Sequence, residues 1–383
     1  MKKKLFVVLV VGCAVFFKTY SQTSNYNSTF KFNEDAIVVQ LSENVYAEIL
    51  PEMELLSGVL TQTSWIDDYG PSEGMGNRYY HRLKSFFEKF KEHEAVEIAD
   101  DILDEGFSYD KPPGFILHLS PLPELKMDSI PQHYIKYTDG IEVLEKFKDA
   151  LKNLSVEANF MDFYRSEKKY LKNTVNSTIN GFDAEKVTNW LNDFFGYKGD
   201  EFHIIFAPAL FPRGGYGPDR IIGDKKIIFQ VITDNGKSND DPFYCSLMNL
   251  ISLTFHEFGH SFVNPAFEEQ SKTMEEFELD ELFDPVESRM RKMAYPSLEF
   301  FFNELHIRAM TIIAMEDYTG TSAETIKMLS QEKDKGFYLV DFTYNKLKEY
   351  KDSRNMYPTF KDFLPDLLKE YSENKSALLK LAE

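Results

Sequence analysis

The stretch Phe255–Pro265 reads FHEFGHSFVNP and contains the pattern HExxH, with His256, Glu257 and His260 at its defining positions. In a helix, residues four apart lie on one face, so both imidazoles can point at the same metal ion. Two neutral imidazoles at this spacing suit zinc, and a glutamate directly after the first histidine can act as general base toward a zinc-bound water. The pattern therefore predicts a catalytic zinc site on a helix.

The sequence around the pattern is typical of a largely buried helix. The flanking residues LISLTFHEFGHSFV are mostly apolar, and apolar residues recur at helical spacing from Phe243 onward. Asp241–Pro242 predicts the start of this helix and Asn264–Pro265 its end. Ionisable groups on a buried helix need a partner or a metal, so a pair of solvated surface histidines fits poorly.

Composition limits the class of protein. The chain has 383 residues, enough for one large domain or two modest ones, and 43% of them are hydrophobic, as in a folded globular protein. The formal net charge of −19 excludes nucleic acid as an expected partner, because binding the phosphate backbone requires Lys and Arg patches.

The first 21 residues are typical of an export signal peptide, so the mature chain is expected to begin at Gln22. Lys2–Lys4 form the positive segment, Leu5–Phe17 form the apolar segment, and small residues follow at the cleavage site. Val10–Cys13 has lipobox-like spacing and offers a lipid anchor at Cys13 as an alternative, but the apolar run continues past it, which favours simple export. The run is too short for a membrane span.

The remaining pattern predicts an α+β chain rich in helix. Residues 22–135 form an N-terminal region of strands and helices that is either separate or part of the catalytic unit, and residues 136–383 form the zinc-dependent catalytic domain. Strands are expected at Ala36–Leu41, Val45–Leu50, Phe202–Ala207 and Lys226–Thr233. Helices are expected at Tyr79–Leu103, Gly140–Asn153, Glu157–Asn176, Asp183–Phe195, Pro296–Met315, Phe337–Lys351 and Tyr357–Tyr371, with a capping box of Thr321 and Glu324 opening another, while the prolines of Lys111–His133 exclude long helices.

A catalytic zinc needs a third protein ligand. Ala266 stands where a HExxHxxGxxH site has its third histidine, and Cys245 is too far from His256 along the helix. Glu304 lies in an apolar helix, where a charge needs a partner. Arg308, one turn later, can form an ion pair that orients this carboxylate toward the metal. Glu299 is the next candidate, and a buried Glu304–Arg308 ion pair without metal is the alternative.

The expected chemistry is hydrolysis. Zinc lowers the pKa of a bound water, Glu257 takes its proton, and the oxyanion that forms needs a hydrogen-bond donor. Tyr338 and His306 are the candidates for this donor, although each could instead be a packed core residue.

These residues resemble a known group of enzymes. HEFGH with a later helical glutamate looks like the zincin metallopeptidases of the gluzincin type, and HEFGHSFVNP with NELHIRA at 303–309 resembles a secreted bacterial family catalogued as a domain of unknown function. The resemblance implies a zincin-like fold with a small, mostly antiparallel sheet, His256, His260 and Glu304 as zinc ligands, and Glu257 as base. Arg308 and Asn264 are expected to support the ligands.

The resemblance also implies an edge strand that pairs with extended substrate beside the zinc helix. Gly214, Gly215 and Tyr216 occupy the matching place, because glycine lets a substrate backbone approach closely. An ordinary hairpin turn is the alternative for this loop.

The sequence therefore predicts a secreted or periplasmic zinc metallopeptidase that acts on peptides or proteins. The alternatives are a zinc amidase acting on a non-peptide or cell-wall amide, and a catalytically silent binding protein with the same fold. Pocket shape decides between the first two, and the sequence leaves oligomeric state open.

Overall fold

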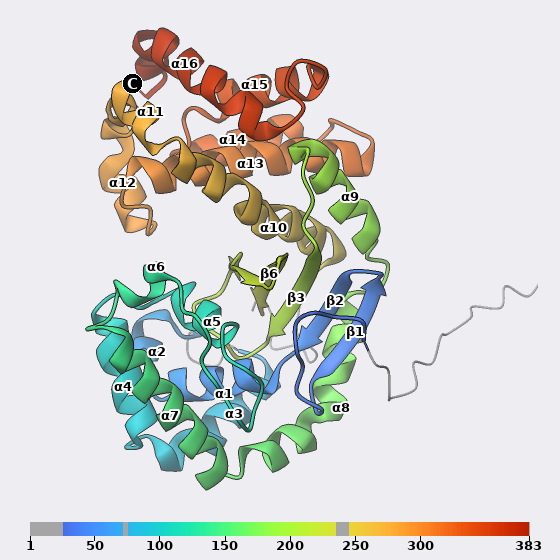
Figure 1. The fold of residues 1–383 in the computed structure, drawn as a ribbon, viewed down its shortest axis with the longest axis vertical. Helices are drawn as coiled ribbons and strands as arrows, with labels where there is room; N and C mark the ends of the chain where they lie inside the picture. The colour runs from blue at the N-terminus through green and yellow to red at the C-terminus, as the bar shows by residue number, and fades with distance from the viewer. Residues whose placement is uncertain (1–25, 72–75, 235–244, 383) are drawn as a thin grey trace, which may run out of the picture.

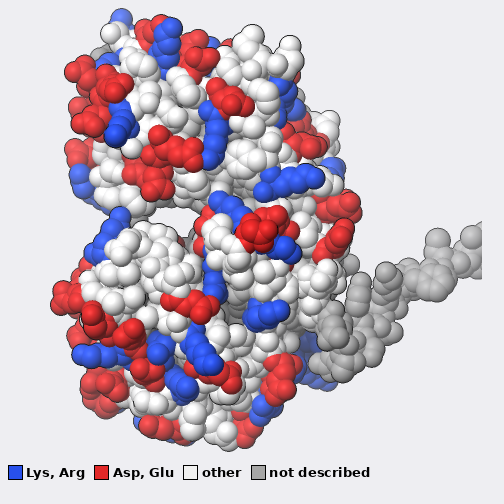
Figure 2. All heavy atoms as spheres, viewed as in Figure 1, with Lys and Arg blue, Asp and Glu red and all other residues white. Residues whose placement is uncertain are grey.

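The computed structural model describes residues 26–71, 76–234 and 245–382, which form two lobes on either side of a central sheet (Figure 1). A cleft between the lobes is visible in the space-filling view (Figure 2).

The first lobe contains α1 (Pro51–Leu60), α2 (Trp65–Tyr69), α3 (Arg78–Phe87), η1 (Glu88–Phe90), α4 (Glu94–Asp104), α5 (Lys111–Ile116), α6 (Gln132–Ile135) and α7 (Ile141–Glu157). The chain then passes through α8 (Phe160–Thr178) and α9 (Ala184–Phe195). The second lobe contains α10 (Leu247–Glu269), α11 (Ser271–Glu276), η2 (Leu279–Leu282), η3 (Asp284–Val286), α12 (Glu287–Lys292), α13 (Leu298–Thr319), α14 (Thr325–Lys335), α15 (Val340–Asp352), α16 (Phe360–Leu379) and η4 (Lys380–Ala382).

The sheet is mixed, so the prediction of a mostly antiparallel sheet is met only in part: among the described strands three pairings are antiparallel and two are parallel. Its strands are β1 (Ile37–Ser42), β2 (Val45–Ile49), β3 (Glu201–Ala207), β4 (Gly215–Tyr216), β5 (Asp219–Ile222) and β6 (Lys225–Thr233). They lie in the order β1-β2-β3-β6-β4, with β5 also paired to β6. The central pairs β2–β3 and β3–β6 are parallel, and the outer pairs are antiparallel. Parallel neighbours need long crossovers, and helices α1 to α9 supply the one between β2 and β3.

The four predicted strands are confirmed within a residue or two of each end. Strands β2 and β3 are buried along their whole length, which is why both read as nearly continuous apolar runs. The sequence had no equally strong signal for the short edge strands β4 and β5.

A buried ion cluster joins the N-terminal segment to the sheet. The His203 imidazole lies between two carboxylates, with Nδ1 2.5 Å from Glu48 Oε1 and Nε2 2.8 Å from Glu201 Oε1. Glu201 also accepts hydrogen bonds from Ser28 Oγ and Thr29 N. Burial alone lowers the pKa of His203, but the two carboxylates outweigh burial and raise it to about 9. The raised pKa favours a protonated His203 ring, held between Glu48 of β2 and Glu201 of β3.

The two predicted regions, residues 22–135 and 136–383, share one sheet and one core. Strands β1 and β2 come from the first region and pair onto β3 of the second. Side chains from both regions belong to the same hydrophobic cluster. The N-terminal region is thus part of the unit that carries the HExxH helix.

Two helix predictions outside the HExxH stretch needed correction. The expected helix Tyr79–Leu103 is broken into α3, η1 and α4, because the His93 ring starts α4 by accepting a hydrogen bond from Ala95 N. The expected capping box of Thr321 and Glu324 does not form, and α14 begins without a side-chain cap. The other predicted helices are present, most of them shifted by a few residues at their ends.

The predicted signal peptide, including Cys13, lies outside the described residues. Among the helices that the structure describes, none combines the length and the apolar character needed to cross a bilayer.

Candidate metal centre

The HExxH stretch lies in α10, which is buried along much of its length. Ser246 caps this helix by accepting a hydrogen bond from Asn249 N, while the predicted start at Asp241–Pro242 lies outside the described residues. Phe258 packs against Phe202 of β3 with 5.1 Å between ring centroids. The helix is therefore held against the sheet at the level of the HExxH pattern.

The predicted helix end at Asn264–Pro265 was wrong, because α10 continues through Pro265 to Glu269. A proline inside a helix leaves the carbonyl four residues earlier without its usual donor. Here Lys226 Nζ donates to that carbonyl, Ser261 O, at 2.7 Å. Tyr197 donates to the adjacent carbonyl of Phe262 at 2.8 Å. Tertiary contacts thus replace the backbone hydrogen bond that Pro265 cannot donate, so the helix continues through the proline.

Gly259, inside the HExxH pattern, faces α13. A Cβ on Gly259 would lie 2.6 Å from the terminal methyl of Met310, the movable end of a flexible side chain, and 3.7 Å from Ile307. Helices α10 and α13 pack along each other, and this packing brings Glu304, one of the buried residues of α13, to the two histidines. His260 and Glu304, 44 positions apart in the chain, therefore meet at the interface of two helices.

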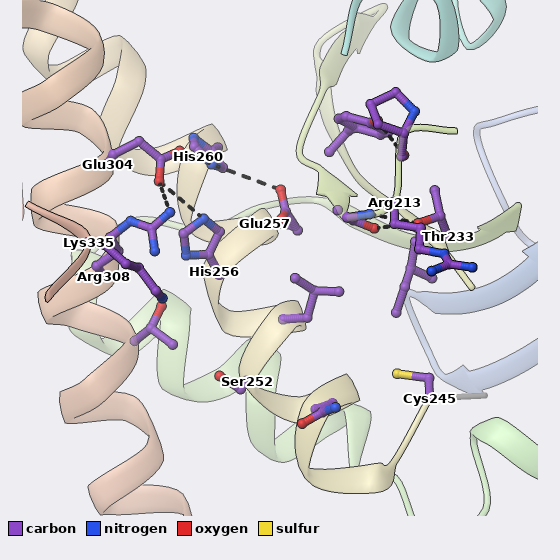
Figure 3. Close-up of a pocket in the computed structure, with 18 of the residues that line it drawn as sticks. Arg213, Thr233, Cys245, Ser252, His256, Glu257, His260, Glu304, Arg308 and Lys335 are labelled. Atoms are coloured by element: carbon purple, nitrogen blue, oxygen red, sulfur yellow. Dashed lines mark hydrogen bonds and ion pairs between the residues drawn. The ribbon is translucent and has the colours of Figure 1, made fainter. Parts of the chain in front are cut away.

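His256, His260 and Glu304 converge on one point, with one ligand atom from each lying within 4.8 Å of the others. His260 Nε2 is 3.4 Å from Glu304 Oε1 and His256 Nε2 is 3.7 Å from Glu304 Oε2. A tetrahedral zinc with ligand distances of about 2.0–2.1 Å separates its ligand atoms by about 3.3 Å. The donor types and their spacing thus fit a zinc ion. Figure 3 shows the three side chains facing one another from α10 and α13.

Charge and burial set the protonation of the site. Burial alone raises the pKa of Glu304, but Arg308 and the imidazoles outweigh it and lower the pKa to about 2. Burial lowers the pKa of His256 to about 3. The site thus presents an ionised carboxylate and, at His256, a neutral imidazole, which are the forms that bind a metal.

The two predicted supporting residues lie where they were expected. Arg308 Nη2 is 2.9 Å from Glu304 Oε2, and its Nη1 is 2.8 Å from Glu332 Oε2. His260 Nδ1 is 3.3 Å from Asn264 Oδ1, an oxygen that can only accept, so Nδ1 carries the proton and Nε2 is free for a metal.

Glu257 lies on α10 between the two histidines, with Oε2 3.9 Å from His260 Nε2. Its pKa is raised by burial and by the nearby charge of Glu304. A basic carboxylate beside the metal position can accept a proton from a water molecule held there.

The loop of Gly214, Gly215 and Tyr216 lies against this carboxylate. A Cβ on Gly215 would overlap the Glu257 carboxylate, and a Cβ on Gly217 would overlap the Glu257 carbonyl. Thr233 N donates to Gly214 O at 3.1 Å, and Gly215 pairs with Ile232 in the antiparallel ladder. Alternate residues of an antiparallel strand face opposite sides, so the N–H and C=O of Gly215 point away from β6. The loop therefore forms an edge strand next to Glu257, and among the described strands none pairs with its outward side.

A cavity of about 720 Å³ is lined by the candidate metal ligands, Glu257 and the glycine loop. Its wall also includes residues that the sequence did not single out, because nothing in their local pattern marks them: Tyr109, Arg213, Tyr295, Thr311, Glu332 and Lys335. The Tyr295 hydroxyl accepts a hydrogen bond from Arg308 at 3.2 Å, so its own proton can be donated elsewhere. Tyr109 belongs to the first lobe and also lines the cavity. Its φ of 59° lies in the left-handed region of backbone conformations.

Three sequence candidates lie away from the metal position. The Tyr338 hydroxyl donates to Leu282 O at 2.7 Å and Tyr338 is not among the residues lining the cavity, so it is not placed as the oxyanion donor. His306 is buried in the core with Nδ1 2.6 Å from Phe302 O. Glu299 is exposed in the first turn of α13. A packed tyrosine and a site tyrosine have the same sequence signal, so only tertiary position separates them.

The sequence matches one family over most of its length. The family described as Domain of unknown function (DUF4932) covers residues 32–370. The chain belongs to this family. The match spans both lobes and includes all the residues of the candidate metal centre. No curated protein and no solved structure matches the chain.

Proposed function

We propose that this protein is an exported zinc metallopeptidase with a zincin-like fold. The observation that carries the proposal is the convergence of His256, His260 and Glu304 at zinc-ligand spacing, with Glu257 adjacent. Bound zinc would supply Lewis acidity toward a carbonyl oxygen and would acidify a water molecule. The presence of Glu257 beside the ligands favours catalysis over a silent binding role.

In this proposal the chain's residues have distinct tasks. Glu257 accepts the proton of the attacking water, and burial makes it a stronger base than an exposed glutamate. Asn264 and Arg308 keep His260 and Glu304 oriented. Tyr295 replaces Tyr338 as the candidate donor to the developing oxyanion, since its hydroxyl lies on the cavity wall beside Arg308.

The edge strand supports a peptide as substrate. The outward N–H and C=O of Gly215 can form main-chain hydrogen bonds with an extended chain lying along β4. The absence of a side chain at Gly215 leaves room for the Glu257 carboxylate between strand and metal position. Backbone pairing of this kind is available to peptides and not to an isolated non-peptide amide.

The test is metal analysis of the purified full chain, followed by hydrolysis of a mixed peptide library and of a cell-wall amide. We expect one zinc per chain, peptide cleavage, and loss of cleavage in Glu257→Gln with zinc retained. Glu268→Gln, an exposed residue of the same helix, is the matched control and should cleave like the wild type. A chain that binds no zinc, or a Glu257→Gln variant with full activity, would contradict the proposal. Cleavage of the cell-wall amide alone would favour the amidase alternative.

A further inference from the structure

The cavity continues past His256 along α10, toward the N-terminal end of that helix. In Figure 3, Ser252 and His256 lie successively along α10, and Glu304 and Arg308 lie on α13 beside the histidines. Ser252, Leu253, Thr311, Ile312, Met328 and Lys335 line the cavity from α10, α13 and α14. Lys335 carries the only charge in this group, and Arg308 and Glu332 line the cavity beside it.

Lys335 is the last residue of α14 and lies beside Arg308 on the cavity wall (Figure 3). Its Nζ is 2.7 Å from Glu332 Oε1, and Glu332 Oε2 is 2.8 Å from Arg308 Nη1. One carboxylate is thus shared by two cations. The side chain of Lys335 remains 46% exposed, so its ammonium keeps room for a further partner.

Thr311 provides a second, independent observation at the same wall. It is 6% exposed, and its hydroxyl has no hydrogen-bond partner within the described structure. Buried hydroxyls are normally satisfied, so the unpaired hydroxyl of this wall residue is a donor still available to a ligand.

The charge of the cavity changes when the metal ligands are occupied. Among the described residues, three basic and four acidic side chains line it, namely Arg213, Arg308, Lys335, Asp234, Glu257, Glu304 and Glu332. A divalent ion bound by Glu304 would change the net charge of this described lining from negative to positive. Glu332 would then be left to balance both Arg308 and Lys335, which favours an incoming anion.

We propose that Lys335 and Thr311 form a subsite for a substrate carboxylate beside the metal centre. The preferred substrates would carry an Asp or Glu side chain, or a free C-terminal carboxylate, close to the cleaved bond. Lys335 supplies the charge and Thr311 supplies a hydroxyl donor. This inference rests on the proposed peptidase function and names the substrate class of the same cavity.

The test compares peptides that differ only in this group. One set places Glu or Gln at each position in turn, and a second set ends in a free acid or an amide, so the two sources of a carboxylate are separated. We expect kcat/KM to be about 10-fold higher for the acidic member, as for one charge-assisted hydrogen bond. In Lys335→Met this ratio should fall close to 1. In Lys333→Met, which removes a lysine of α14 that pairs with Asp341 outside the cavity, the ratio should be kept.

Binding separates this inference from the proposed function. The zinc-loaded Glu257→Gln protein is titrated calorimetrically with the same peptide pairs, and Thr311→Val serves as a second variant of nearly equal volume. Tighter binding of the acidic member without any wild-type hydrolysis would support the subsite and overturn the peptidase proposal. Equal binding and equal hydrolysis of both members, or binding of neither, would overturn the subsite.

Discussion

Substituting alanine for Gly215 should remove activity without removing stability. A Cβ at this position would lie 2.7 Å from Glu257 Cδ and 2.8 Å from Glu257 Cγ. Ordinary carbon contacts are about 3.5–4.0 Å, so the glutamate side chain must retreat by about 1 Å. Gly215 is not among the residues with positive φ, so its backbone accepts alanine. A misplacement of about 1 Å can lower a rate by about 100-fold, and we expect that loss in kcat/KM.

Gly217→Ala is the matched control, because its Cβ meets a part of the molecule that cannot move aside. It would lie 3.0 Å from the Glu257 carbonyl carbon and 3.1 Å from His260 Cβ, both fixed to the α10 backbone. We expect Gly217→Ala to lower the free energy of unfolding by about 1–3 kcal/mol, and Gly215→Ala to change it by less than about 1 kcal/mol.

The assays are urea unfolding, zinc content and peptide hydrolysis for both variants. Full activity of Gly215→Ala would refute the placement of Glu257 beside the edge strand. A loss of activity that only follows a loss of stability or zinc would refute it equally.

Three further predictions concern stability. The pKa of His203 is raised to about 9 from an ordinary 6.5, so its protonation stabilises the fold fully below pH 6.5 by up to about 3 kcal/mol. This contribution is lost as the pH rises through 9. Urea unfolding between pH 6 and 10 should show the loss, and His203→Gln should make the free energy of unfolding less dependent on pH in this range. Lys226→Met should lower the free energy of unfolding by about 1–2 kcal/mol, because it leaves Ser261 O unpaired. In a Pro265→Ala background residue 265 regains its N–H, so the same substitution should lower the free energy of unfolding by less, as measured by urea unfolding. Zinc at 100 times its Kd should stabilise the native chain by about 2.7 kcal/mol in thermal unfolding, and a full shift in His256→Ala would contradict the proposed ligands.

The predicted positions that the structure reproduces most directly concern residues near one another in the chain. His256, Glu257 and His260 could be read from spacing alone, because the period of a helix places them whatever the rest of the fold does. Asn264 follows His260 by one turn and bonds to it for the same local reason. Glu304 was found by a different route, since a charge in an apolar helix requires a partner.

The predictions that failed depended on what packs against an element. Pro265 ends most helices, but here Lys226 from a neighbouring strand takes over the freed carbonyl and the helix continues. Tyr338 has the composition of a site residue, yet its hydroxyl is used inside the core. The sheet is mixed because strands from distant parts of the chain become parallel neighbours, and alternation within one strand carries no information about its partner.

The amino-acid sequence by itself determined the HExxH pattern, the helix that carries it and the need of a buried acid for a partner. Only the tertiary structure decided which glutamate lies beside the two histidines and how close Gly215 lies to Glu257. It also decided which side chains, such as Tyr295 and Lys335, line the cavity. The physical reason is the distance along the chain over which each effect acts. Helical spacing acts over a few residues, whereas a cavity wall is assembled from segments whose separation in the chain leaves no mark on their local composition.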